Sequence, residues 1–290
     1  AATTDADNLA ARVYSLSGAD AALLDIDAAT GAVTLKSSAD YETKATYSFN
    51  VLANDGANST TQAVTVTVNN LNDNAPAPTG ATVTLSESVA AATAVADVSD
   101  AFTTTDLDRD GNTITYSITA GNGNGIFAIN SSTGAITIAA GKSLDFETAA
   151  QHALTVTATD GTLSGTSTVT VNVGNENDTA PVFTSGGVAS VNENALTSTV
   201  VYTAVTTDAD NLAARTYSLS GTDAALLTIN PTSGAVTLNS SANFEAKASY
   251  SFNVVANDGA NNTTQAVVLS VVNQNDAPTG TPYIAGTALQ

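Results

Sequence analysis

AVTVTVNNLNDNAP, residues 63–76, combines the two features that decide the fold of this chain. Valine recurs at every second position, which is the pattern of a strand with one buried face. A linker rich in Asn and Asp follows and ends in proline. Related linkers occur as ENDTAP at residues 176–181 and QNDAP at residues 274–278. A linker that only had to bend would use Gly and Ser, so the recurrent Asn and Asp side chains require another explanation.

The sequence around this stretch is a tandem repeat. DADNLAARVYSLSG at residues 5–18 returns as DADNLAARTYSLSG at residues 208–221, and DLDRDGNTITYSIT at residues 106–119 is a diverged middle copy. We therefore predict three repeats, over residues 1–74, 75–178 and 179–276, with residues 277–290 forming a linker and the start of a next first strand. The first repeat lacks a counterpart of the first strand of the others.

Each repeat shows the alternation of strands with one buried face. The residues expected on that face are Tyr47, Phe49, Val51 and Ala53, then Val64, Val66 and Val68 in the first copy; Leu154, Val156 and Ala158, then Val169, Val171 and Val173 in the second; and Tyr250, Phe252, Val254 and Ala256 in the third. Gly31, Gly134 and Gly234 occupy hairpin positions that require a positive φ. The pattern predicts an all-β chain of tandem seven-stranded antiparallel Greek-key sandwiches.

The composition excludes several classes of protein. The formal net charge is −20, which disfavours nucleic acid and anionic membranes as partners and favours cations. The chain has no cysteine, so neither a disulfide nor thiol chemistry is available. No apolar run is long enough for a membrane span, and the N-terminus lacks the basic and apolar parts of a signal peptide. We therefore expect a mature, soluble piece with no direct membrane insertion.

Acidic residues recur at matched positions in the repeats. The four groups are an Asp-x-Asp motif, an acid-aromatic-Glu motif, an Asp before Gly, and the linker Asp. The Asp-x-Asp motifs contain Asp5, Asp7, Asp106, Asp108, Asp208 and Asp210, and the acid-aromatic-Glu motifs contain Asp40, Glu42, Asp145, Glu147 and Glu245. The acids before Gly are Asp55, Asp160 and Asp258, and the linker acids are Asp73, Asp178 and Asp276. So many carboxylates can approach one another only if a cation neutralises them, and six to eight oxygen ligands suit calcium.

With these motifs, the chain resembles the cadherin repeat in the Ala-, Thr- and Asn-rich form found in large bacterial surface proteins and adhesins. The resemblance implies Ca²⁺ ions between successive domains, an extracellular or cell-surface location, and neighbouring repeats as partners. The chain ends add identical chains, joined end to end, as a further expected partner. For the first junction it implies ligands from Asp40, Glu42, the Leu71 carbonyl, Asn72, Asp73, the Asn74 carbonyl, Asp106, Asp108 and Asp160. For the second it implies Glu87, Asp145, Glu147, the Glu176 carbonyl, Asn177, Asp178, Asp208, Asp210 and Asp258. Half-sites at the ends would use Glu193, Glu245, Asn275 and Asp276, and Asp5, Asp7 and Asp55.

The chain departs from this pattern in three places. The first repeat has no early Glu, so the first junction is expected to hold its ions less tightly. Asn243 stands where the other copies have Asp. Thr179 and Ala277 replace the Asn of the family pattern, which is tolerable if only the backbone oxygen binds the ion.

Other motifs are weaker. Residues 106–117 imitate an EF-hand loop, but the last position is Ser117 instead of Glu and no flanking helices are expected. GNGNG at residues 121–125 lacks the context of a phosphate-binding loop. His152 is expected to be a solvated residue rather than a ligand or base. We predict that the chain is not an enzyme.

Two functions remain. The favoured one is a calcium-rigidified structural repeat of a surface fibre or adhesin. The alternative is an adhesive module that recognises a surface, a sugar or another cell, which an exposed cluster of Tyr14, Tyr202 or Tyr217 would favour. The ends raise a further hypothesis, in which residues 279–289 of one chain complete the first repeat of the next by strand donation and build filaments. An arbitrarily cut fragment explains the ends at least as well.

Overall fold

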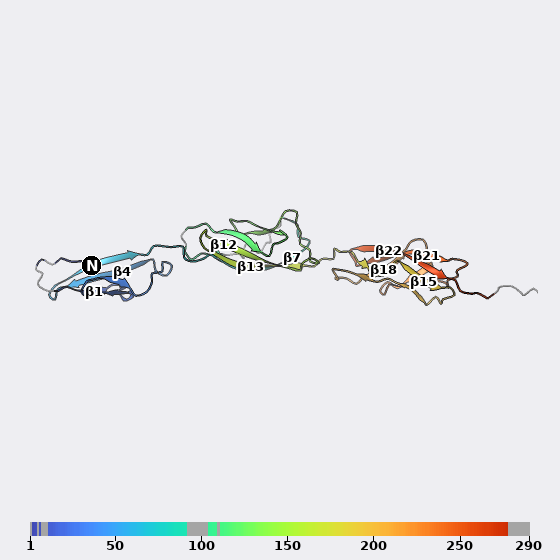
Figure 1. Ribbon diagram of the computed structural model, residues 1–290, viewed down its shortest axis with the longest axis horizontal. Coiled ribbons are helices and arrows are strands. Elements are labelled where there is room, and N and C mark those ends of the chain that lie inside the picture. The colour runs from blue at the N-terminus through green and yellow to red at the C-terminus, as the bar shows by residue number, and fades with distance from the viewer. Residues whose placement is uncertain (1, 5, 7–10, 92–103, 109–110, 278–290) are drawn as a thin grey trace, which may run out of the picture. The chain divides into compact units, whose positions relative to one another are not determined.

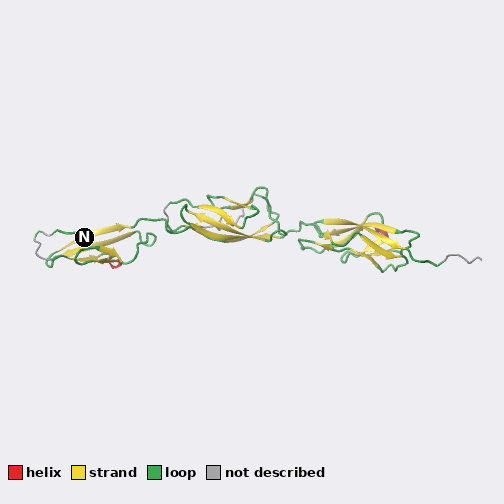
Figure 2. Ribbon diagram, in the orientation of Figure 1, coloured by secondary structure: helices red, strands yellow, loops and turns green. Residues whose placement is uncertain are grey.

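The computed structural model describes residues 2–4, 6, 11–91, 104–108 and 111–277. The chain divides into two compact units. The first unit contains residues 1–85, 89–144 and 151–172, and the second contains residues 86–88, 145–150 and 173–290. Strands and loops make up nearly all of both units, with two short 3-10 turns, η1 (Ala21–Leu23) and η2 (Ala224–Leu226) (Figure 2).

The first repeat contains a three-stranded sheet in the order β1-β4-β5 and a β2-β3 hairpin. Its strands are β1 (Val13–Ser17), β2 (Leu24–Ile26), β3 (Val33–Leu35), β4 (Thr46–Asn54) and β5 (Ser59–Thr67). The β4 and β5 strands pair antiparallel along their full length, from Thr46 opposite Thr67 to Asn54 opposite Ser59. Gly31, between β2 and β3, has a φ of 70°, as the hairpin position required.

The second repeat has a four-stranded sheet in the order β7-β13-β12-β9, a β10-β11 hairpin and a small β6-β8 pair. Its strands are β6 (Ala77–Pro78), β7 (Ala81–Ser86), β8 (Thr104–Thr105), β9 (Thr115–Ala120), β10 (Phe127–Ile129), β11 (Ile136–Ile138), β12 (Gln151–Thr159) and β13 (Ser164–Gly174). His152, on β12, lies edge-on to Phe127 with the ring centroids 5.3 Å apart. It is partly buried, and that burial lowers its pKa.

The third repeat shows the complete arrangement, with sheets β15-β22-β21-β18 and β16-β20-β19 and a β14-β17 pair (Figure 1). Its strands are β14 (Val182–Phe183), β15 (Val188–Asn192), β16 (Val200–Thr203), β17 (Thr206–Thr207), β18 (Thr216–Ser220), β19 (Leu227–Ile229), β20 (Ala235–Leu238), β21 (Ser249–Asn257) and β22 (Asn262–Val272). The predicted all-β sandwich is confirmed with one difference. β15 runs parallel to β22, with Val188 opposite Val268, so the sheet is not purely antiparallel.

The predicted buried faces form the cores of the repeats. Tyr47, Phe49, Val51 and Ala53 are buried together on β4, and the corresponding faces of β12 and β21 are buried as well. The prediction is wrong for Val66 on β5, whose side chain is 44% exposed. Its counterpart in the third repeat is Leu269, which is fully buried. Within the described part of the chain, β5 has β4 as its one neighbour, whereas β22 lies between β15 and β21.

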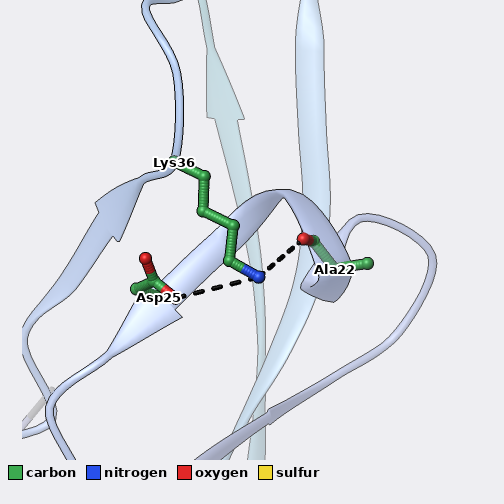
Figure 3. A network of polar contacts seen from close by, with 3 residues as sticks. All are labelled: Ala22, Asp25 and Lys36. Atoms are coloured by element: carbon green, nitrogen blue, oxygen red, sulfur yellow. Dashed lines mark hydrogen bonds and ion pairs between the residues drawn. The ribbon is translucent and has the colours of Figure 1, made fainter.

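Polar contacts of Lys36 stabilise the β2-β3 hairpin of the first repeat (Figure 3). The Lys36 ammonium donates to the Ala22 carbonyl oxygen at 2.9 Å and lies 3.7 Å from the Asp25 carboxylate. In the third repeat Asn239 takes the position of Lys36 and donates to the carbonyl oxygen of Ala225 at 3.0 Å. The same turn is therefore fixed by an ammonium in one repeat and by an amide in the other.

Candidate calcium sites

The first acidic cluster consists of Glu42, Asp73 and Asp108 and lies within the first compact unit. One oxygen from each carboxylate lies within 4.8 Å of the others. The three residues come from the acid-aromatic-Glu motif, the linker and the Asp-x-Asp motif, so segments far apart in the sequence converge at this point. The sequence predicted all three as ligands of the first junction.

Hydrogen bonds from the linker hold Asp108 in place. The Asn74 backbone N–H donates to Asp108 Oδ2 at 2.9 Å, and the Asn74 side-chain amide donates to Asp108 Oδ1 at 2.7 Å. The Asn70 side chain donates to the Asp108 carbonyl oxygen at 2.6 Å. Asp106 accepts a hydrogen bond from the Asp108 backbone N–H at 3.1 Å, which closes the Asp-x-Asp turn.

The second acidic cluster lies within the second compact unit and contains two overlapping groups. Glu87, Asp145 and Glu147 form one group, and Glu147, Asp178 and Asp210 form the other, each with oxygens within 4.8 Å of one another. Glu147 belongs to both groups. The second cluster therefore gathers more carboxylates than the first.

The linker holds Asp210 as it holds Asp108. The Thr179 backbone N–H donates to Asp210 Oδ2 at 2.8 Å, and the Asn175 side chain donates to the Asp210 carbonyl oxygen at 2.9 Å. Asp208 accepts from the Asp210 backbone N–H at 3.2 Å. The backbone N–H of Thr179 thus replaces that of Asn74. Among the described residues, no side-chain hydrogen bond from Thr179 to Asp210 replaces the one from the Asn74 amide to Asp108.

An early Glu connects the linker to the acid-aromatic-Glu motif in two repeats. Glu87 accepts from the backbone N–H groups of Phe146 and Glu176, each at 2.6 Å. Glu193 accepts from the N–H of Phe244 at 3.0 Å and from that of Gln274. Each of these glutamates is buried. Because both of its carboxylate oxygens accept backbone hydrogen bonds, the early Glu fixes the segments that carry the other acids.

The Asp before Gly is also buried at both junctions. The backbone amides of Leu163 and Thr162 and the Asn72 side chain lower the pKa of Asp160. Asp258 is completely buried, and the amides of Asn261 and Ala260 together with the Asn177 side chain lower its pKa. In each junction a linker Asn thus reaches the late Asp of the following repeat.

Three of these buried carboxylates keep an oxygen without a hydrogen-bond partner. They are Asp160 Oδ2, Asp210 Oδ1 and Asp258 Oδ2. Burying an ionised oxygen without a partner is costly, and the unpartnered oxygen of Asp210 lies in an acidic group whose donors fit a cation.

Burial and neighbouring acids raise the pKa of one Glu in each cluster. Burial raises the pKa of Glu147, and the neighbouring Asp210 and Glu87 raise it further. Burial likewise raises the pKa of Glu42, with Asp108 and Asp73 adding to the effect. A divalent cation among these carboxylates would favour their ionised forms and reverse this trend.

The structure does not bring every predicted ligand into the clusters. Asp40 caps a local turn by accepting from the Thr43 N–H and hydroxyl at 3.0 and 2.8 Å. Glu193, Glu245 and Asp276 form a third group of acids, and ligation by Asn275 stays a prediction. Asp55 accepts from the amides of the turn that follows it. Asp5 and Asp7 lie outside the described residues. Ligation by the carbonyl groups of Leu71, Asn74 and Glu176 stays a prediction.

Sequence reasoning missed the Asn two positions before the linker Asn. Asn70 and Asn175 donate to the backbone of the Asp-x-Asp motif in the following repeat. The signal was present, because Asn-x-Asn-Asp occurs at residues 70–73, 175–178 and 273–276. The amide nitrogen of this Asn donates hydrogen bonds, a role that a pattern of oxygen ligands does not predict.

The fold and these clusters define a class of protein built from tandem β-sandwiches with acidic junctions. The profile of the cadherin domain matches residues 82–174 and 188–273, so the chain belongs to the cadherin family. Cadherin domains are extracellular, non-enzymatic modules of adhesion proteins, and this chain is such a module. Among the described residues, no helix has the length and apolar character to cross a bilayer.

Relatives and solved structures agree with this assignment. The chain is 43% identical to human Protocadherin Fat 4 over 149 residues, which is 49% of this chain and 3% of that protein. It is 37% identical to the Protocadherin-like wing polarity protein stan of Drosophila melanogaster over 174 residues, which is 56% of this chain and 5% of that protein. The chain therefore spans a small part of these relatives. They are animal proteins and do not support a bacterial origin.

The crystal structure of mouse Cadherin-23 EC22-24 matches with a TM-score of 0.72 and 27% identity, over 90% of this chain and 86% of that one. The Protocadherin gammaB7 EC3-6 cis-dimer structure matches with a TM-score of 0.74 and 26% identity, over 95% and 71% of the two chains.

Proposed function

We propose that this chain binds Ca²⁺ at the first and second acidic clusters and that the ions stiffen the connections between successive repeats of an extracellular surface protein. The observation that carries the proposal is the set of buried carboxylate oxygens without partners, Asp160 Oδ2, Asp210 Oδ1 and Asp258 Oδ2, at the predicted junctions. Each lies in a segment that hydrogen bonds tie to a linker.

The donor set suits calcium better than other common metals. The clusters offer carboxylate, amide and carbonyl oxygens, and none of the chain's residues is a cysteine. Hard oxygen ligands in large number favour Ca²⁺, whereas Zn²⁺ prefers nitrogen and sulfur. A bound ion would neutralise the carboxylates. Glu42, Asp73, Asp108 and Asp160 would hold it in the first cluster, and Glu87, Asp145, Glu147, Asp178, Asp210 and Asp258 in the second.

Calorimetric titration of the full chain with calcium tests the proposal. We expect saturable binding, and Asp210→Asn should weaken it because this substitution removes a buried charge from the second cluster. Asp25→Asn is the matched control, since that carboxylate is exposed and distant in sequence from every acidic motif. Equal loss of affinity in both variants would mean that net charge governs binding, and no binding by the native chain would refute the proposal.

The adhesive alternative is less well supported. Tyr14, Tyr202 and Tyr217, which would have favoured it if exposed together, are all buried. A role in a bacterial surface fibre, and end-to-end assembly of identical chains, are finer proposals with less support. The segment assigned to strand donation, residues 279–289, lies outside the described residues. The repeat boundaries given above likewise stay proposals.

A further inference from the structure

Several Asn residues of the chain stand in the sequence Asn-x-Ser/Thr, where x is not proline. This is the acceptor sequence for N-linked oligosaccharides. The residues are Asn58, Asn130, Asn177, Asn239, Asn261 and Asn262. Attachment of a sugar replaces one of the two protons on the side-chain nitrogen Nδ2 and needs open space beside it. The contacts of each Asn side chain in the folded chain therefore distinguish these positions.

All but one of these Asn side chains are engaged in hydrogen bonds. Those of Asn177, Asn239 and Asn261 donate from Nδ2 to backbone carbonyl oxygens. Asn130 Oδ1 accepts from two backbone N–H groups of the turn that follows it. The Asn58 side chain bonds to a neighbouring carboxylate. A large substituent on any of these side chains would disturb a contact that the folded chain uses.

Asn262 is the exception. It is exposed at the start of β22, and no hydrogen bond of its side chain is present within the described part of the chain. Thr264, the last residue of its acceptor sequence, is exposed as well. Because side chains alternate across a strand, Asn262 and Thr264 point to the same face of β22. This outer face is opposite to the one that carries the buried Leu269.

The outer face of the third repeat is also apolar further along the strand. Val268 and Val272 on β22 are 45% and 42% exposed, and Val188, opposite Val268 on β15, is 80% exposed. The strands of this sheet, β15, β18, β21 and β22, contain no charged residue (Figure 1). An apolar and uncharged sheet face favours association between chains unless something covers it.

The first repeat lacks both features. Each position of β5 has a counterpart 203 residues later on β22, as Ser59 has in Asn262. Thr65 and Asn69 stand in the places of Val268 and Val272. The free acceptor Asn and the exposed valines therefore occur in the same repeat and on the same face of its sheet.

We propose that Asn262 carries an N-linked oligosaccharide and that this sugar covers the apolar outer face of the third repeat. Val268 lies about 20 Å from Asn262 along β22, at about 3.3 Å per residue. A branched oligosaccharide spans this distance. The proposal does not depend on calcium.

The attachment needs an oligosaccharide linked to a lipid diphosphate as the donor, which the secretory pathway supplies. The bond between the anomeric carbon of the sugar and the diphosphate breaks, and a bond from that carbon to Asn262 Nδ2 forms. The diphosphate leaves as an anion with the electron pair of the broken bond, and the proton lost from Nδ2 goes to solvent.

Secretion of the full chain from animal cells, followed by mass spectrometry of its peptides before and after removal of N-linked sugars, tests the site. We expect an oligosaccharide on Asn262 and none on Asn261. Thr264→Ala should abolish the modification, whereas Thr264→Ser should retain it, because serine keeps the hydroxyl of the acceptor sequence. An unmodified Asn262, or a sugar on Asn261 in its place, overturns the proposal.

Sedimentation of the same two variants in chelator tests the covering role. We expect the Thr264→Ser chain to remain monomeric at concentrations at which the Thr264→Ala chain self-associates. Adding Val268→Thr and Val272→Asn, the residues of the first repeat, to Thr264→Ala should restore the monomer. A monomeric Thr264→Ala chain overturns the covering role. Association that persists with both polar substitutions overturns it too, because the contact would then lie on another face.

Discussion

Asp20 and Asp223 occupy matching positions in the first and third repeats and make the same contacts. Asp223 accepts a hydrogen bond from the Ser251 N–H at 2.7 Å and lies 2.9 Å from the Lys247 ammonium. Asp20 has the equivalent contacts with Ser48 and Lys44. Each lysine also lies over a core tyrosine ring, at 5.4 Å from its centroid. One carboxylate thus joins the 3-10 turn to the central strand of the sheet.

We expect Asp223→Ala to destabilise the third repeat by about 1–3 kcal/mol, because the Ser251 N–H loses its charged acceptor. The Ser251 amide and Lys247 lower the pKa of Asp223 in the folded state. A depressed folded pKa gives stability that is present above the unfolded value, about 3.9, and is lost as the pH falls through the folded value. The difference between the native chain and the variant in urea unfolding should therefore shrink below about pH 4. A difference independent of pH would show that the charge contributes nothing.

Glu147 belongs to both groups of the second acidic cluster, whereas Glu42 belongs to the single group of the first. We expect Glu147→Gln to reduce calcium affinity at the second cluster by about tenfold or more, which corresponds to about 1.4 kcal/mol. Glu42→Gln should reduce binding at the first cluster alone. Calorimetry of both variants would show whether each substitution weakens calcium binding at a different cluster. If both variants lost the same binding step, the two clusters would not bind calcium independently.

At the scale of the strand, sequence alternation predicted the buried faces of β4, β12 and β21 because alternation depends only on local geometry. It failed for Val66 because the burial of a strand face also depends on what covers it, and no strand lies beyond β5 among the described residues. The parallel pairing of β15 was missed for a similar reason. Direction of pairing is set by chain connections rather than by the residues of one strand.

The acids of the candidate site, like the buried strand faces, could be predicted from the sequence only in part. Recurrence identified Asp73, Asp108 and Asp210 as acids that should converge, and they lie in the clusters. Recurrence could not show that Asp145 lies in a cluster whereas Asp40 lies in none of the groups found among the described residues. Both carboxylates cap their own turns and occupy matching positions, so the difference depends on the neighbouring acids, and Glu87 has no counterpart in the first repeat.

Val66 and Leu269 form a matched pair for testing the effect of the covering strand. Leu269→Ala should cost about 2–5 kcal/mol, because it leaves a cavity in a closed core. Val66→Ala should cost less than about 1 kcal/mol, because the side chain is already partly in water. Hydrogen exchange followed by mass spectrometry would report the opening of each repeat separately. Similar losses at both positions would mean that β5 is covered in solution.

At the scale of the whole chain, the apolar cores are formed within single repeats, whereas the acidic clusters combine residues of successive repeats. Buried clusters of apolar residues lie inside the first and third repeats, each formed from that repeat's own strands. The acidic clusters instead combine residues from two successive repeats. With a net charge of −20, removal of calcium should increase repulsion at the junctions and leave the cores intact.

We therefore expect chelation to loosen the connections between repeats without unfolding them. If free calcium is about a hundredfold above the dissociation constant, binding stabilises the occupied form by roughly 2.7 kcal/mol per site. Small-angle scattering should show a changed maximum dimension in chelator, while circular dichroism keeps its strand signal. The paired change Asp178→Asn with Asp210→Asn should produce part of this effect even in calcium, and Asp25→Asn should produce none. A maximum dimension that is the same with and without calcium would rule out the stiffening role, because an ion that braces a junction must restrict the angles it can adopt.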